Sequence, residues 1–114
     1  MALNHVELTV RDRPRSAAFY AEHFGLIRTL HDDERRLILG CNEGSVLALV
    51  SGEPPRLPSV NHFGFQLADG DAVRAARERF RTAGLEETEW QDDGKFVRVQ
   101  IADPDGYRVE VYAF

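Results

Sequence analysis

Cysteine is almost absent from this chain, which has Cys41 as its single copy among 114 residues. One cysteine can form neither an intramolecular disulfide framework nor a cysteine-rich zinc site, and it fits a reducing compartment. The chain also lacks an apolar run near the roughly 18 residues of a membrane span, and its first residues lack the layout of a signal peptide. We therefore expect a cytoplasmic protein that does not enter a membrane.

Basic residues are not in excess. Lys and Arg number 14 against 19 Asp and Glu, which gives a net charge of −5. Because nucleic acid requires a basic footprint, this balance argues against a nucleic-acid partner. The apolar content of 43% and charged content of 29% are typical of a globular protein. The length fits one domain, residues 1–114.

The second half of the sequence repeats the first. NHVELTVRD at residues 4–12 returns half the chain length later as NHFGFQLAD at 61–69. Helical patterns follow at Arg13–Phe24, with Asp12 as its expected N-cap, and at Asp71–Ala83. After each helix the apolar period changes to two, which predicts three strands per half. These strands are expected at 27–31, 35–40 and 45–51, and at 86–91, 95–102 and 107–113.

Each half therefore reads strand, helix and three strands, which predicts an α+β fold of two tandem βαβββ modules. The modules are expected at 1–54 and 60–114, joined by a proline-rich linker at 51–59. One such module alone would expose a face of its sheet. We expect the two together to form a curved mixed sheet around a central cleft, with the helices outside.

Strand alternation predicts which side chains face that cleft. His5 and His62 occupy equivalent positions of the two copies, on the face opposite the apolar residues. Glu110 and Ala48 each lie four residues after an equivalent turn glycine. The duplication thus defines four corresponding positions, and His5, His62 and Glu110 are metal-ligand types.

Two imidazoles and one carboxylate suit Fe, Mn, Ni, Co or Zn as a divalent ion. Three ligands on one side leave the other side open for a substrate. We therefore predict one divalent metal ion, of unknown identity, held by His5, His62 and Glu110.

Further residues are candidates for substrate contacts. Glu7 lies two residues after His5 and is a candidate general base or partner of a cationic substrate group, or else a rim carboxylate paired with Arg28, Arg36 or Arg98. Arg98 and Gln100 alternate with apolar residues and are expected to orient an anionic or polar substrate, with pairing to Glu7 as the alternative. Trp90 and Phe96 are candidates for an apolar wall, with a place in the core as the alternative. Ala48 completes the predicted substrate-binding set.

The segments NHVELTVRD, AAFYAEHFGL, VNHFGFQLAD and DPDGYRVEVYAF resemble the vicinal oxygen chelate superfamily. This superfamily contains glyoxalase I, fosfomycin-resistance thiol transferases, extradiol dioxygenases and bleomycin-type resistance proteins. The resemblance implies paired βαβββ modules, dimerisation, a central metal, and substrates that bind it through two neighbouring oxygens. Its histidines fall on His5 and His62 and its C-terminal acid on Glu110, whereas Ala48 stands where glyoxalase I has a fourth, acidic ligand.

The fosfomycin enzymes and the dioxygenases have side chains that this chain lacks. The fosfomycin enzymes usually have hydroxyl side chains near Arg98 and Gln100, and the dioxygenases need a further histidine that residues 63–114 lack. We therefore expect a metal-dependent enzyme for a small oxygen-chelating substrate, acting by lyase or isomerase chemistry, addition or dioxygenation. The alternative is a metal-free protein that binds a small molecule or an antibiotic. In either case we expect a homodimer.

Overall fold

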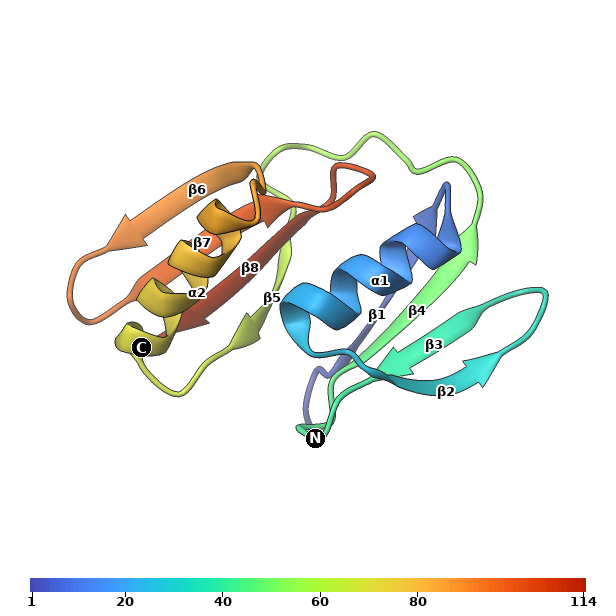
Figure 1. The fold of residues 1–114 in the computed structure, drawn as a ribbon, viewed down its shortest axis with the longest axis horizontal. Helices are drawn as coiled ribbons and strands as arrows, with labels where there is room; N and C mark the ends of the chain where they lie inside the picture. The colour runs from blue at the N-terminus through green and yellow to red at the C-terminus, as the bar shows by residue number, and fades with distance from the viewer. The chain divides into compact units, whose positions relative to one another are not determined.

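The chain forms two compact units in a computed structural model that describes every residue from Met1 to Phe114. Unit 1 is Met1–Arg56 and unit 2 is Leu57–Phe114, so their boundary falls inside the proline-rich segment 51–59. Each unit contains one helix and one four-stranded mixed sheet (Figure 1). The predicted α+β class and the two βαβββ modules are therefore confirmed.

Unit 1 has its four strands in the order β1-β4-β3-β2. β1 and β4 are parallel, and the remaining neighbours are antiparallel. Its elements are β1 His5–Val10, α1 Arg13–Phe24, β2 Arg28–Asp32, β3 Leu37–Gly40 and β4 Val46–Ser51. In Figure 1 the helix α1 lies along one face of this sheet.

Unit 2 repeats this topology with the order β5-β8-β7-β6, in which β5 and β8 are parallel. Its helix α2 packs on β7 and β8. Its elements are β5 Phe63–Gln66, α2 Gly70–Thr82, β6 Glu87–Asp92, β7 Val97–Ala102 and β8 Arg108–Ala113.

Equivalent aspartates begin the two helices. The Asp12 carboxylate accepts from the Arg15 backbone N–H at 3.0 Å, and the Asp69 carboxylate accepts from the Ala72 N–H at 2.8 Å. Gly25 then ends α1 in the left-handed conformation, with φ of 71°. Each cap accepts from a free N–H of the first helical turn, which explains why an aspartate occupies the same position in both copies of the repeat.

The core of unit 2 lies between α2 and one face of the sheet. Alternate residues of β7 and β8 are buried there, against Val73, Ala76 and Phe80 of the helix. The other residues of β7 and β8 therefore point to the opposite face, which α2 leaves uncovered. That face contains Arg98, Gln100 and Glu110.

His62 is the main departure from the predicted strands. We expected a strand over 61–69, but β5 begins only at Phe63. The Asn61 backbone N–H donates to the Pro58 carbonyl at 3.0 Å, and this turn keeps the chain from pairing earlier. His62 thus precedes its strand, whereas His5 is the first residue of β1.

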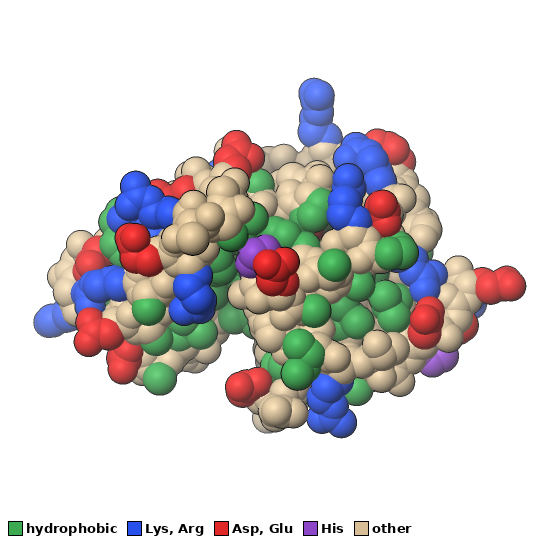
Figure 2. Space-filling view, viewed as in Figure 1, with side chains coloured by type: hydrophobic (Ala, Val, Ile, Leu, Met, Phe, Trp, Pro, Cys, Tyr) green, Lys and Arg blue, Asp and Glu red, His purple; other side chains and the backbone are tan.

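The surface mixes charges of both signs. In Figure 2 acidic and basic side chains are interspersed over both units, without a broad patch of one sign. Many of these groups are paired, for example Arg74 with Asp71 and Asp92 at 2.8 Å each. Neither helix has the length and apolar character that a membrane-spanning helix requires.

Candidate functional site

Two of the three predicted ligands meet in unit 2. His62 Nε2 lies 3.7 Å from Glu110 Oε1. The Glu110 side chain is buried, with 8% of its surface exposed, whereas that of His62 is 36% exposed. Glu110 comes from the middle of β8 and His62 from the turn before β5, and these two strands are direct neighbours.

The ring orientation of His62 leaves a lone pair towards Glu110. His62 Nδ1 lies 2.8 Å from the Val60 carbonyl oxygen, which can only accept a hydrogen bond. Nδ1 must therefore carry the proton, so Nε2 of the neutral ring is an acceptor. Nε2 and a carboxylate oxygen are then two acceptors facing one another, too far apart for a hydrogen bond. Ligands about 2.1 Å from one ion lie roughly 3–3.6 Å apart at ordinary angles. The 3.7 Å pair is slightly wider than this, and a small side-chain movement would bring the two atoms to a shared cation.

Arg98 binds the carboxylate of Glu110. Its Nη1 donates to Glu110 Oε1 at 2.7 Å, its Nε donates to Gln91 at 3.1 Å, and its Nη2 donates to Glu89. The Arg98 side chain is only 15% exposed. The hydrogen bond to Glu110, followed by the charges of Glu110 and Glu89, raises the pKa of Arg98. Glu110 is therefore held by an internal cation.

Gln100 places an amide next to Glu110 with one end unpartnered. The two residues are Cα partners of the β7–β8 ladder, and Gln100 is 1% exposed. Its Oε1 accepts from the Thr88 hydroxyl at 3.0 Å, while its Nε2 is buried without a partner. Exchanging the amide oxygen and nitrogen would still leave one polar atom unpaired. A ligand oxygen that reached this position would satisfy the amide.

Gly64 makes room for the backbone of Glu110. It is the Cα partner of Glu110 across the β5–β8 ladder. A Cβ at Gly64 would lie 2.9 Å from the Glu110 carbonyl oxygen and 3.1 Å from its Cβ. The repeat has Glu7 at this position in unit 1, so the close approach explains why the second copy has glycine instead.

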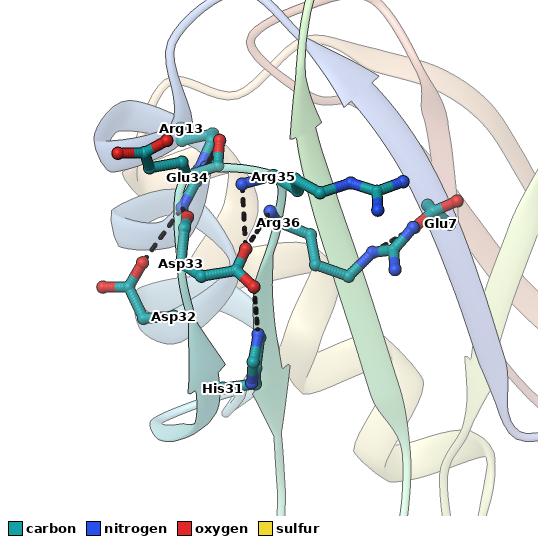
Figure 3. Close-up of polar contacts among 8 residues, drawn as sticks. All are labelled: Glu7, Arg13, His31, Asp32, Asp33, Glu34, Arg35 and Arg36. Carbon is teal, nitrogen blue, oxygen red and sulfur yellow. Dashed lines mark hydrogen bonds and ion pairs between the residues drawn. The ribbon is translucent and has the colours of Figure 1, made fainter.

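Unit 1 arranges the equivalent groups differently. Glu7 is the Cα partner of Ala48, as Gly64 is of Glu110. The acid of unit 1 is thus on β1, where Glu7 Oε1 accepts from Arg36 Nε at 2.9 Å (Figure 3). Each unit therefore pairs an arginine with the acid of this ladder position, which is Glu7 of β1 in unit 1 and Glu110 of β8 in unit 2.

The turn before β3 positions Arg36. The Asp33 carboxylate accepts from the backbone N–H groups of Arg35 and Arg36 at 2.8 and 2.9 Å, and it contacts His31 Nε2 at 2.8 Å (Figure 3). These bonds, led by that from Arg36, hold the pKa of Asp33 well below its usual range. The Glu7 side chain is 46% exposed and already paired, as expected for a rim carboxylate.

The remaining predicted residues lie in separate places. Trp90 is on the α2 side of the sheet, where the Arg77 guanidinium stacks 4.1 Å from its ring centroid. Phe96 stacks on Phe114 with ring centroids 5.1 Å apart, just before β7. His5 is exposed at the start of β1 in unit 1.

The sequence did not indicate a role for Glu89, which accepts from Arg98, or for Thr88, which donates to Gln100. The β6–β7 ladder has a bulge between Glu87 and Glu89. A bulge shifts which residues face one another, and period-two counting does not predict it. Nowhere in the chain do three His, Cys, Asp or Glu side chains gather into a possible metal site.

Known proteins match the chain along its whole length. A family model described as the Glyoxalase/Bleomycin resistance protein/Dioxygenase superfamily matches residues 2–111. Among solved structures, the fosfomycin resistance protein FosX from Listeria monocytogenes aligns with a TM-score of 0.84 and 21% identity, over 100% of this chain and 93% of that one. FosX has also been solved as a complex with Mn(II) and a sulfate ion.

Two further structures have the same fold. A possible glyoxalase from Bacillus cereus aligns with a TM-score of 0.80 and 24% identity, over 97% of both chains. A lactoylglutathione lyase from Agrobacterium tumefaciens aligns with a TM-score of 0.75 and 24% identity, over 98% of this chain and 92% of that one.

Proposed function

The chain belongs to the Glyoxalase/Bleomycin resistance protein/Dioxygenase superfamily, and on that basis we propose that it is a divalent-metal-dependent enzyme acting on a small oxygen-chelating substrate. The observation that carries this proposal is the pairing of His62 and Glu110, in which Nε2 and Oε1 lie 3.7 Å apart. His5 is the proposed third ligand. The reaction class is lyase or isomerase chemistry, addition or dioxygenation.

The donor set fits such an ion. Imidazole nitrogen and carboxylate oxygen suit Mn, Fe, Co, Ni and Zn, and the Val60 carbonyl orients His62 as outer partners of ligating histidines do. The Mn(II) complex of FosX supports a divalent ion in a protein of this fold. Such an ion supplies Lewis-acid stabilisation of negative charge that develops on substrate oxygens.

The protein groups around Glu110 have separate proposed roles. Gln100 offers a buried amide that binds and orients a substrate oxygen. Phe96 is proposed to contact apolar parts of the substrate, and Glu7 is the candidate base in unit 1. Arg36 holds Oε1 of Glu7, so the candidate base would accept a proton on its other carboxylate oxygen.

Metal content tests this proposal directly. We expect close to one equivalent of ion per chain after repletion with Fe, Mn, Ni, Co or Zn, and a loss of the ion in Glu110→Ala. Glu87→Ala is the matched control, because Glu87 pairs with Arg77 of α2 and should leave metal content unchanged. Less than about a tenth of an equivalent in the wild type, as for adventitious binding, would contradict the proposal.

A second candidate function is favoured by Arg98. Its guanidinium already neutralises Glu110, as would suit a metal-free protein that sequesters a small molecule or an antibiotic. Tight binding of such a compound by the His5→Ala, His62→Ala double variant would support this alternative. The homodimer and the cytoplasmic location stay predictions, and sedimentation of the 12.9 kDa chain tests the first.

A further inference from the structure

We infer that Arg98 is a built-in counter-cation for Glu110, which holds this carboxylate in the absence of an ion and releases it when a divalent cation binds. The inference rests on the proposed function, because it takes Glu110 as a metal ligand. It goes further in assigning to Arg98 the control of metal affinity.

Both potential partners approach the same carboxylate oxygen. Arg98 Nη1 lies 2.7 Å from Glu110 Oε1, and His62 Nε2 lies 3.7 Å from that same atom. An ion shared by His62 and Glu110 would therefore meet a guanidinium at the oxygen it needs. The guanidinium cannot lose its charge in a protein, so the ion and Nη1 compete for that oxygen, and repulsion separates the oxygen from Nη1.

Hydrogen bonds to the neighbouring strand β6 hold Arg98 in place. β7 lies between β8, which contributes Glu110, and β6, which contributes Glu89 and Gln91. Nε and Nη2 are already bonded to Gln91 and Glu89, so only the Nη1 bond has to break. Arg98 can thus keep two of its three bonds while the Glu110 carboxylate turns away from Nη1.

The duplication shows that this contact is particular to unit 2. Ile38 pairs with Ala48 as Gln100 pairs with Glu110, so Arg36, just before β3, corresponds to Arg98. Arg36 bonds Glu7 of β1. The unit 1 position equivalent to Glu110 is Ala48. An arginine is therefore present in both copies, and only Arg98 holds a proposed metal ligand on the last strand.

Mn(II) affinity measured on purified protein by electron paramagnetic resonance of the free ion tests the inference. We expect Arg98→Gln to bind Mn(II) about ten- to a hundred-fold more tightly than the wild type, because a competing charge-assisted hydrogen bond is gone. Arg77→Gln is the control, since it removes the same charge from the opposite face of the same sheet. It should bind within about twofold of the wild type, as expected for a screened distant charge.

Unchanged or weaker binding by Arg98→Gln would overturn the inference, and so would equal tightening by Arg77→Gln. Should Arg98→Gln fail to fold, side-chain NMR of the wild type provides the measurement. Addition of Zn(II) should speed solvent exchange of the Arg98 Nη protons and leave those of Arg77 unchanged. Zn(II) binding without a change at Arg98 would contradict the inference.

The two proposals can fail separately. Mn(II) binding by the wild type with no tightening in Arg98→Gln contradicts the role of Arg98 alone. Mn(II) binding by Arg98→Gln but not by the wild type contradicts a metal-dependent function of the natural protein and supports the role of Arg98. Absence of binding by both contradicts both.

Discussion

Gln100 illustrates at the scale of one residue how this site differs from a core. It is almost fully buried, yet its amide has one partner, Thr88, and one end without any. A buried unpaired amide group destabilises the fold by roughly 1–3 kcal/mol. A strand position that packed only for stability would favour an apolar residue of the same size. The cost is therefore consistent with a residue that binds a ligand oxygen.

Gln100→Met tests this reading of the amide. We expect the free energy of unfolding to change by less than about 1 kcal/mol, because the lost Thr88 bond is offset by removal of the unpaired Nε2. Urea denaturation measures it. Thr88→Val is the control and should lose about 1–3 kcal/mol, since it leaves the Gln100 amide with no partner at all. A larger loss in Gln100→Met than in Thr88→Val would contradict the prediction.

Single residues also show where sequence reasoning stops. Glu110 and His62 were predictable as ligand types from the repeat, and the structure places them 3.7 Å apart. The contact of Arg98 with Glu110 was not predicted, because strand alternation indicates a shared face but not a rotamer. Trp90 was proposed for the cleft wall and lies on the α2 side, where Arg77 covers it.

At the scale of elements, α2 is attached to the edge strand β6 by ion pairs. Arg77 donates to Glu87 at 2.7 and 3.0 Å, and its guanidinium also covers Trp90. The hydrogen bond from Arg77 is the main cause that lowers the pKa of Glu87 below 4.5. The ionised carboxylate is thus favoured in the folded state, and it helps to hold the helix on the sheet that carries the site.

This attachment predicts a pH-dependent stability. Because the pKa of Glu87 is lowered on folding, its contribution is complete above pH 4.5 and is lost as the pH falls through the lower folded value. We expect Glu87→Gln to be about 1 kcal/mol less stable than the wild type at neutral pH. The difference should shrink towards zero in acid, as followed by urea denaturation from pH 7 downwards.

Glu78→Gln is the matched control, since the Glu78 carboxylate makes no close bond to Arg77 and lies 3.8 Å from the exposed Arg81. It should leave stability nearly unchanged at each pH. A constant difference between wild type and Glu87→Gln through the acid range would rule out the proposed coupling.

Most elements were predictable because their signals are local. The helix Arg13–Phe24 was predicted with the bounds that the structure has, since Asp12 and Gly25 mark its ends. The strands after each helix were found within a few residues. β5 was predicted too long, because the turn that bonds Asn61 to Pro58 depends on backbone geometry that alternation does not encode.

At the scale of the whole molecule, the two copies of the repeat carry an acidic residue on different strands of the same ladder. Unit 1 has Glu7 opposite Ala48, and unit 2 has Gly64 opposite Glu110. In each pair a small residue faces an acidic one, because two long side chains would crowd one another at neighbouring positions. The small partner leaves room for the acid of its pair, and the strand that carries the acid differs between the two units.

An acid introduced at position 48, opposite Glu7, tests whether the two positions exclude one another. Ala48→Glu should lower the free energy of unfolding by about 1–3 kcal/mol, since it crowds Glu7 and adds a like charge. Adding Glu7→Gly reproduces the arrangement of unit 2. We expect the double variant to lose at least about 0.5 kcal/mol less than the sum of the two single variants.

Urea denaturation of the four proteins gives the coupling. Ala48→Gln serves as the neutral control, because it adds the bulk of Ala48→Glu without its charge. Additive losses in the double variant would contradict the idea that the two positions exclude one another.

The sequence by itself determined the duplicated βαβββ topology, the ends of α1 and the identity of His5, His62 and Glu110 as a possible ligand set. These follow from period, capping and repeat position, which are properties of neighbours along the chain. Only the tertiary structure decided that Arg98 holds Glu110, that Gln100 keeps an unpaired amide and that Trp90 lies under α2. Such contacts depend on register, a bulge and rotamers, which arise when strands distant in sequence pair with one another.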